Sequence, residues 1–371
     1  MPTMKAARAY KGASTLKLEQ IEVPEPGAGE VLVQVAAAGI APGMMKLLAS
    51  GRFKHLPTTP GHEIAGVVVR VGQDVDQAWL DARVRVHPML SCGHCNYCLS
   101  DRQQMCNESA MIGHAAFGRG ALELYARYHN GGLAEFIKVP ADLLDRLPDH
   151  VSFDVGAKVH DLANAVRALK QAALPATGRL VITAATGTMG TASIKLARFY
   201  GARELVLVAR SRQRLEALLP LAEGLPTRIL ALDELAEDWA QTTALTDRLH
   251  EMVPEGFDAV LDYFPEGCGS QQVAAAMALG GTFVHMGGNS ASIPFAFREM
   301  MINCWRFVGT RACTRSDTTD VIKLLATREL DAELLITHRF ALDDVNQALA
   351  ATQSRDEPIW MAVVRPDHAR G

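Results

Sequence analysis

The sequence predicts a two-domain α/β protein, in which a mostly β, barrel-like domain is combined with a doubly wound domain built on a parallel sheet. Three observations predict this fold class. The chain has 371 residues, enough for two cores at roughly 150 residues each. Short strand-like runs and turns fill the first 150 residues, and strands alternate with helices from about Phe153 onward. We expect residues 1–152 and 300–371 to form the β-rich domain and 153–299 the parallel one.

Runs of β-branched residues between turn residues define the first domain. Strands are expected at Val31–Ala37, Ile64–Val71, Val84–Pro88 and Leu133–Val139. The segment Gly113–Asn130 is expected to be a long loop, either at the rim of a substrate site or simply solvated.

In the second domain, short apolar runs alternate with stretches that carry apolar residues at helical spacing. Strands are expected at Arg179–Ala184, Glu204–Ala209, Thr227–Leu232, Phe257–Tyr263 and Gly281–Met286. Helices are expected at Val155–Gln171, Gly190–Tyr200, Arg212–Leu221, Thr242–Met252 and Ser270–Leu279.

The composition excludes several classes of function. Lys and Arg number 37 and Asp and Glu 41, a formal net charge of −4 without a basic stripe, which argues against nucleic acid as a partner. No apolar run approaches the roughly 20 residues of a membrane helix, and the first residues lack the apolar core of a secretory signal. We therefore expect a cytoplasmic protein that acts on a small molecule.

A glycine-containing loop follows the first strand of the second domain and leads directly into a helix. Glycine lets the backbone approach a pyrophosphate, and a helix N-terminus offers N–H groups and a positive dipole. Ala185 stands where the first glycine of a complete G-x-G-x-x-G motif would be. The residues expected to bind a dinucleotide here are Gly187, Thr188, Met189 and Gly190, with Gly287 after a later strand.

The end of the next strand indicates which dinucleotide binds. Proteins that bind NAD usually carry Asp or Glu there, about 20 residues beyond the loop, to hold the ribose 2′-hydroxyl. Here the place falls on Ala209, followed by Arg210, Ser211 and Arg212. Two guanidinium groups and a hydroxyl suit a 2′-phosphate, so the sequence favours NADP(H), with NAD(H) as the alternative.

Four cysteines cluster within fifteen residues. Cys92, Cys95, Cys98 and Cys106 have the spacing of a closed four-thiolate zinc site, which leaves no open position for chemistry. An iron–sulfur cluster is the competing interpretation, but Asn107 rather than proline follows the last cysteine. We therefore expect one structural zinc ion.

Motifs spread over nearly the whole chain point to one family. They are GHE at 61–63, AGVVVRVG at 65–72, the four cysteines, GLAEF at 132–136, the loop at 185–190 and ITHRF at 336–340. Together they resemble the medium-chain dehydrogenase/reductase superfamily, in its zinc-containing alcohol dehydrogenase branch. The resemblance implies a GroES-like catalytic domain, a Rossmann domain, an active site between them and a homodimer or homotetramer.

The resemblance also implies a catalytic zinc ion, yet its ligand places have changed. Where the family has its first ligand, a cysteine, this chain has Ala41. The second ligand is matched by His62, and the third place falls around His160. Glu63 or Asp161 would have to complete a rebuilt site, and we expect that the cleft holds no zinc.

The family's hydroxyl relay has changed as well. Its first member falls on Gly43, and a histidine further along corresponds to Lys46. Without the metal, a side chain must supply the acid, and His160 is the first candidate because an imidazole titrates near neutral pH. His62 and Lys46 come next, and Asn164 is a candidate for holding nicotinamide or substrate.

The sequence thus predicts an NADP(H)-dependent oxidoreductase that moves hydride between nicotinamide and a small carbonyl, alcohol or activated alkene. Loss of the zinc ligand favours reduction of a C=C bond conjugated to a carbonyl, because less alkoxide charge then needs stabilising. A strict zinc-free conjugate reductase is the alternative. A catalytically silent NADP(H) sensor is the second alternative.

Overall fold

The computed structural model describes residues 1–50, 53–120, 123–176, 178–293, 295–354 and 356–366. The chain forms two compact units, Met1–His160 with Thr314–Gly371 and Asp161–Cys313. Helix α4 (Phe153–Ala172) begins in the first unit and continues into the second.

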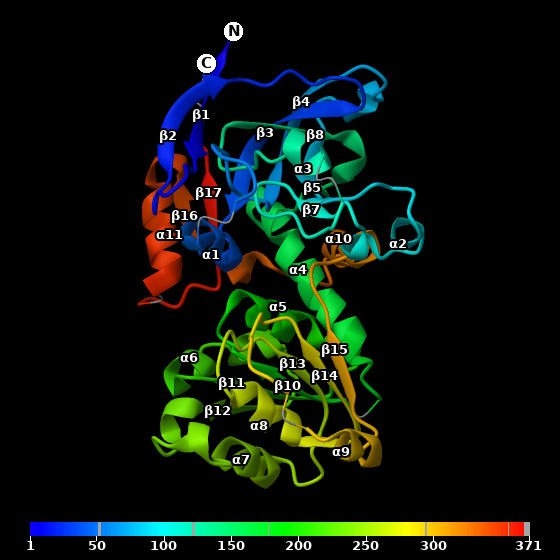
Figure 1. The fold of residues 1–371 in the computed structure, drawn as a ribbon, viewed down its shortest axis with the longest axis vertical. Helices are drawn as coiled ribbons and strands as arrows, with labels where there is room; N and C mark the ends of the chain where they lie inside the picture. Colours follow the sequence, from blue (N-terminus) through cyan, green and yellow to red (C-terminus); the bar gives the residue numbers. More distant parts are fainter. Residues whose placement is uncertain (51–52, 121–122, 177, 294, 355, 367–371) are drawn as a thin grey trace. The chain divides into compact units, whose positions relative to one another are not determined.

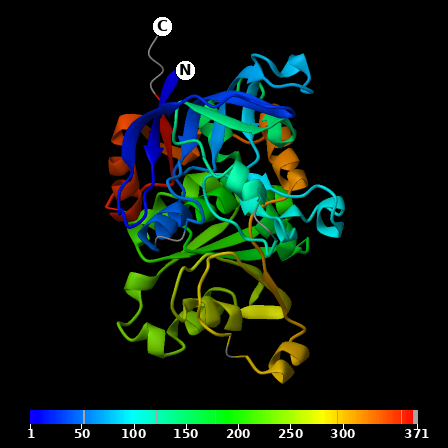
Figure 2. The same cartoon turned by 45° about the horizontal axis from the view of Figure 1, so that its top comes forward.

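A seven-stranded sheet forms the centre of the first unit, in the order β16-β17-β3-β4-β5-β9 with β8 also paired to β3. The C-terminal strand β17 pairs antiparallel with β3, which joins the end of the chain to its first strands. Figures 1 and 2 show α10 and α11 on opposite sides of these strands. The elements are β1 (Thr3–Arg8), β2 (Lys17–Glu22), β3 (Glu30–Gly39), α1 (Pro42–Ser50), β4 (Ile64–Val71), β5 (Arg83–Val86), β6 (Met89–Leu90), α2 (Asn96–Leu99), β7 (Ala110–Met111), α3 (Glu123–Arg127), β8 (Phe136–Pro140), β9 (Leu144–Arg146), α10 (Arg315–Ala326), β16 (Ile336–Ala341), α11 (Val345–Ser354) and β17 (Met361–Arg365).

The second unit is built on a parallel sheet with the order β12-β11-β10-β13-β14-β15. The chain order reverses between β10 and β13, which is the topological switch point of a doubly wound fold. Val181, Val206 and Val260 share one apolar cluster with residues of α7 and α8. The elements are β10 (Arg179–Thr183), α5 (Thr188–Leu196), β11 (Glu204–Ala209), α6 (Arg212–Glu216), β12 (Thr227–Ala231), α7 (Ala244–Met252), β13 (Phe257–Asp262), α8 (Gly269–Ala275), β14 (Met277–His285), α9 (Phe297–Ile302) and β15 (Arg306–Gly309).

This architecture confirms the predicted α/β fold class, while several boundaries differ from those expected. The structure divides the chain after His160 and after Cys313, later than residues 152 and 299. Strand β15 belongs to the second unit because it pairs in parallel with β14. Within the described residues, no helix is long and apolar enough to cross a membrane.

The segment Gly113–Asn130 differs from the expected loop, because it contains the short helix α3. Tyr125 and Tyr128 are buried in the apolar core of the first unit. The Tyr125 hydroxyl donates to the backbone oxygen of His114 at 3.1 Å. Aromatic burial therefore ties this segment to the core and gives His114 a defined position.

Candidate functional site

The four cysteines meet in a small lobe between β6 and β7. All four sulfur atoms lie within 4.8 Å of one another. Cys98 Sγ is 3.5 Å from Cys95 Sγ and 3.9 Å from Cys92 Sγ. Tetrahedral zinc with Zn–S bonds of about 2.3 Å requires S···S separations of about 3.8 Å, so the cluster fits a zinc ion.

Backbone N–H groups point at these sulfurs, as expected for thiolate ligands. The N–H of Cys95 donates to Cys92 Sγ at 3.4 Å, and that of Glu108 donates to Cys106 Sγ at 3.3 Å. The Cys98 backbone N–H is the main cause that lowers the pKa of Cys95 to about 7, whereas burial raises the pKa of Cys98 and raises that of Cys106 to about 12. Tyr97 and Leu99 are exposed, so the lobe has little apolar core, and cross-linking through a metal would hold it together.

Three imidazoles of the first unit form a second cluster, which we call the three-histidine group: His62, His114 and His160. The ring centroids of His62 and His114 are 4.7 Å apart, and those of His62 and His160 are 5.2 Å apart. Both contacts are edge-on, with interplanar angles of 76° and 90°. His62 lies two residues before β4 begins at Ile64, and His160 lies in α4.

Burial makes the three-histidine group neutral at physiological pH. Desolvation lowers the pKa of His62 to about 3, with a further contribution from the Lys158 ammonium. Desolvation also lowers the pKa of His114 to about 3, and it lowers the pKa of His160 well below 6.5. The expectation that His160 titrates near neutral pH therefore does not hold, because the residue is only 2% exposed and desolvation disfavours the charged imidazole.

A buried ion pair lies beside the three-histidine group. Lys158 Nζ donates to Glu63 Oε2, and both side chains are almost completely excluded from solvent. Glu63 Oε1 is 3.6 Å from His62 Nε2. A β-carbon on Gly39 would lie 1.9 Å from Glu63 Oε2, so only glycine at this position leaves room for the pair.

The residues expected to rebuild a catalytic zinc site do not form a ligand set. Among the described residues, the cysteines are the only group of three or more His, Cys, Asp or Glu whose ligand atoms lie close enough to share an ion. Ala41 presents a buried methyl group, and Glu63 is held by Lys158. The described positions of His62, Glu63, His160 and Asp161 therefore do not bring three ligand atoms together.

The other two catalytic candidates differ in their placement. Lys46 is exposed in α1, whereas Asn164 follows His160 by about one turn of α4. Gly43 faces His114: a β-carbon there would lie 3.3 Å from His114 Nε2. The sequence predicted only that His114 lies in the loop Gly113–Asn130. The spacing of His62 and His114 in the chain does not indicate that their side chains meet.

The dinucleotide candidates lie at the carboxyl end of β10, in the second unit. Gly187 is the N-cap of α5, and its N–H donates to Ala184 O at 2.9 Å. A β-carbon on Gly190 would lie 2.4 Å from Ala185 O, so glycine is required where α5 packs on the turn. Thr188 and Met189 are the first two residues of α5, and a helix N-terminus offers N–H groups and a positive dipole that suit a phosphate.

The end of β11 carries a neutral residue followed by cations, as the sequence indicated. Ala209 is the last residue of β11, and Arg210 is exposed directly after it. Ser211 is the N-cap of α6 and makes no side-chain capping bond. Arg212 pairs with Glu234, a carboxylate partner that sequence reasoning missed.

Gly287 packs against the end of β13. A β-carbon at Gly287 would lie 2.5 Å from Phe264 O and 2.6 Å from the Tyr263 carbonyl carbon. The position thus requires glycine for packing, and it places the loop after β14 beside the switch point.

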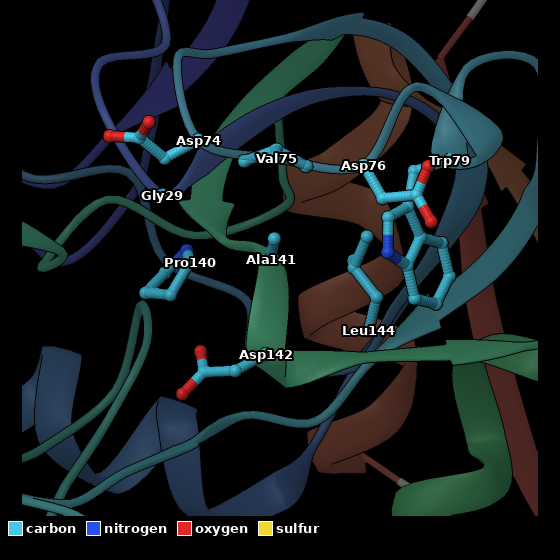
Figure 3. Close-up of a pocket in the computed structure, with 9 residues that line it drawn as sticks. All are labelled: Gly29, Asp74, Val75, Asp76, Trp79, Pro140, Ala141, Asp142 and Leu144. Carbon is cyan, nitrogen blue, oxygen red and sulfur yellow. The ribbon is translucent and has the colours of Figure 1, made fainter.

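The first unit also has a surface pocket (Figure 3). None of the residues expected to bind cofactor, metal or substrate lines it. Asp76 is used locally, because it accepts the Ala78 N–H, and Arg146 stacks on Trp79. The lining residues are Gly29, Asp74, Val75, Asp76, Trp79, Pro140, Ala141, Asp142 and Leu144.

Comparison with known proteins places the chain in a family. Residues 27–149 match the alcohol dehydrogenase GroES-like domain, and residues 188–327 match the zinc-binding dehydrogenase domain. The chain therefore belongs to the medium-chain zinc alcohol dehydrogenase superfamily, whose members are oxidoreductases.

Individual relatives are distant but cover almost the whole chain. An L-threonine 3-dehydrogenase of Saccharopolyspora erythraea is 27% identical over 341 residues, 91% of this chain and 92% of the relative. An NAD-dependent alcohol dehydrogenase of Sulfolobus acidocaldarius is 25% identical, over 93% and 95% of the two chains. A solved alcohol dehydrogenase from Escherichia coli CFT073, complexed with NADH, is 21% identical with a TM-score of 0.84, covering 98% and 100%; it shows the shared fold.

Proposed function

We propose that the protein is a nicotinamide-dependent oxidoreductase that reduces a small carbonyl compound or an activated alkene, or catalyses the reverse reaction. The observation that carries the proposal is the Gly187–Gly190 turn, which presents the N-terminus of α5 at the carboxyl edge of a parallel sheet. Bound nicotinamide would supply or accept the hydride. The cysteine lobe serves the fold rather than the chemistry, because four thiolates would close the coordination shell of zinc.

We further propose that the reaction does not use a zinc ion at the three-histidine group. The proposal is supported by the methyl group of Ala41 and by the engagement of Glu63 with Lys158. Without a Lewis acid, hydrogen-bond donors must stabilise negative charge that develops on oxygen. A neutral imidazole still carries one N–H donor, so burial does not remove this capacity from the group.

The two candidate reactions place different demands on these donors. Carbonyl reduction builds a full alkoxide, whereas conjugate reduction spreads the charge over an enolate that a nearby acid protonates. We favour conjugate reduction because neutral imidazoles donate more weakly than a metal ion or an imidazolium.

The decisive experiment combines metal analysis with isotope transfer. Purified protein should contain one zinc ion per chain, and [4-²H]NADPH should transfer deuterium to the β-carbon of enones. Transfer to the carbonyl carbon instead would establish carbonyl reduction. Two zinc ions per chain would overturn the zinc-free proposal. Tight NADPH binding without transfer to any enone, aldehyde or ketone would identify a silent sensor.

We propose NADP(H) as the preferred cofactor. Support comes from the neutral end of β11 and from the exposed guanidinium of Arg210 next to Ser211. Arg212 is the weaker candidate, because Glu234 already binds it. Arg210→Ala should weaken NADPH binding about tenfold or more and leave NADH binding nearly unchanged, as measured by cofactor fluorescence. Equal loss for both cofactors would contradict the preference.

We also propose that the protein assembles into a homodimer or homotetramer through the second unit. Several large apolar side chains are exposed there on and around α9, with exposed fractions of 90% for Phe297 and 69% for Met301. Leu279, at 78%, and Ile293, at 57%, extend this apolar surface. Light scattering should give a dimer or tetramer that Phe297→Ser weakens, and a monomeric wild type would refute the proposal.

A further inference from the structure

A buried polar network crosses the switch point of the parallel sheet. Asp262 ends β13, and its side chain is fully excluded from solvent. Thr183, at the end of β10, donates its hydroxyl to Asp262 Oδ1 at 2.7 Å. Ser270, in α8, donates to Asp262 Oδ2 at 2.8 Å. The Asp262 carboxylate therefore accepts hydrogen bonds from a strand and from a helix at the switch point between β10 and β13. A doubly wound sheet binds its ligand at this point.

His285 connects this carboxylate to the loop after β14. Its Nδ1 lies 2.7 Å from Asp262 Oδ2, and its Nε2 lies 3.1 Å from the backbone N of Asn289. A backbone N–H can only donate, so Nε2 must be the acceptor. The ring proton then sits on Nδ1 and is donated to Asp262. Both ring nitrogens are thus committed, one to the sheet edge and one to the loop.

Asn289 is the anchor of the loop that His285 holds. Its side-chain Nδ2 donates to Gly267 O at 2.9 Å and to Ser270 Oγ at 3.1 Å, and its Oδ1 accepts the Ala291 N–H at 3.0 Å. The same loop contains Gly287, which packs against the end of β13. The shape of residues 286–291 therefore depends on contacts that converge at the switch point.

We propose that His285 is a positioning residue for cofactor binding. Its ring links the Asn289 backbone to buried Asp262 and thereby fixes the loop of residues 286–291. The inference rests on the proposed nicotinamide-dependent function. Loss of the ring would leave Asp262 bonded to Thr183 and Ser270, so the sheet edge should persist. The main consequence should be a looser loop and weaker dinucleotide binding, rather than loss of the fold.

Two substitutions of His285 separate its two bonds. His285→Asn keeps a donor near the position of Nδ1 but removes the acceptor for the Asn289 N–H. His285→Gln places an amide oxygen near the position of Nε2 and so retains that acceptor. Both variants should be assayed in the full-length protein, with NADPH and NADH titrated by fluorescence and the midpoint of thermal unfolding measured in parallel.

We expect His285→Asn to weaken binding of both dinucleotides about five- to tenfold, the loss expected for one hydrogen bond, whereas His285→Gln stays within about twofold of wild type. Hydrogen exchange of residues 286–291 should accelerate in His285→Asn, while exchange in α5 stays unchanged. In turnover, the cofactor KM should rise while kcat at saturation is maintained. A merely structural role would instead lower the unfolding midpoint of both variants and move kcat.

The outcomes distinguish this inference from the function on which it rests. If wild-type protein binds neither NADPH nor NADH, the proposed function fails and the inference fails with it. If wild type binds but His285→Asn binds equally well, the inference alone is overturned. Equal weakening in both variants, with loss of thermal stability, would also overturn it, because the Asn289 bond would then not be the cause.

Discussion

Acidification should destabilise the first unit through its buried histidines. Desolvation lowers the folded-state pKa of His62 and of His114 from 6.5 to about 3. The unfolded chain therefore takes up protons first as the pH falls. The stability associated with each neutral imidazole is fully present above pH 6.5 and is lost progressively between pH 6.5 and 3.

The size of the effect follows from these two values. Between pH 7 and pH 5 the imidazole of the unfolded chain becomes almost fully protonated, while the imidazole of the folded chain stays neutral. Each of the two histidines should therefore lower the free energy of unfolding by about 2 kcal/mol over this pH interval. His62 protonation also disfavours that of His114, because the two charges repel. Replacing His114 with a residue that does not titrate should therefore remove about 2 kcal/mol of this pH dependence.

The assay is urea unfolding at pH 7, 6 and 5 for wild type, His114→Gln and His250→Gln. His250, on the last turn of helix α7 in the second unit, is the matched control. The criterion is the change in the free energy of unfolding of His114→Gln between pH 7 and pH 5, and not its value at pH 7. If wild type and His114→Gln lose the same free energy over this interval, the reasoning from burial is refuted.

Three further predictions test the zinc lobe, the buried ion pair and the dinucleotide turn. Cys106→Ser should release the zinc ion and make residues 92–106 sensitive to protease while hydride transfer persists; retained metal by elemental analysis would contradict the lobe assignment. Lys158→Met should cost about 3–5 kcal/mol because it leaves the Glu63 carboxylate buried without its counter-ion. Adding Glu63→Gln should recover most of that loss in urea unfolding, and strictly additive losses would show that the pair is not coupled. Gly190→Val should weaken dinucleotide binding at least tenfold, since its β-carbon meets Ala185 O at 2.4 Å; normal binding would place the dinucleotide elsewhere.

Local patterns predicted the parts of this protein that depend on neighbours in the chain. The cysteine lobe, the turn before α5 and the neutral end of β11 are each contained in a short segment. Spacing alone therefore indicates their geometry. The alternation of strands and helices predicted the parallel sheet in the same way, because each connection is short.

Contacts between distant segments were not visible in these patterns. Glu63 and Lys158 are 95 residues apart, and no periodicity links a glutamate before one strand to a lysine in a later helix. Arg212 has a suitable partner in Glu234 only because β11 and β12 are adjacent in the sheet. Strand β15 was assigned to the other domain because its sequence does not reveal that β14 is its partner.

The sequence by itself determined the fold class, the four-cysteine zinc site and the glycine-containing turn before α5, since each rests on residue types and spacings within one local segment. Only the tertiary structure decided that His114, rather than Lys46, joins His62 and His160, and that Asp262 and His285 meet at the switch point. The physical reason is that strand pairing and the burial of Tyr125 bring these groups together over long stretches of chain. The same burial lowers the pKa of the histidines and makes their chemistry different from that of the free side chain.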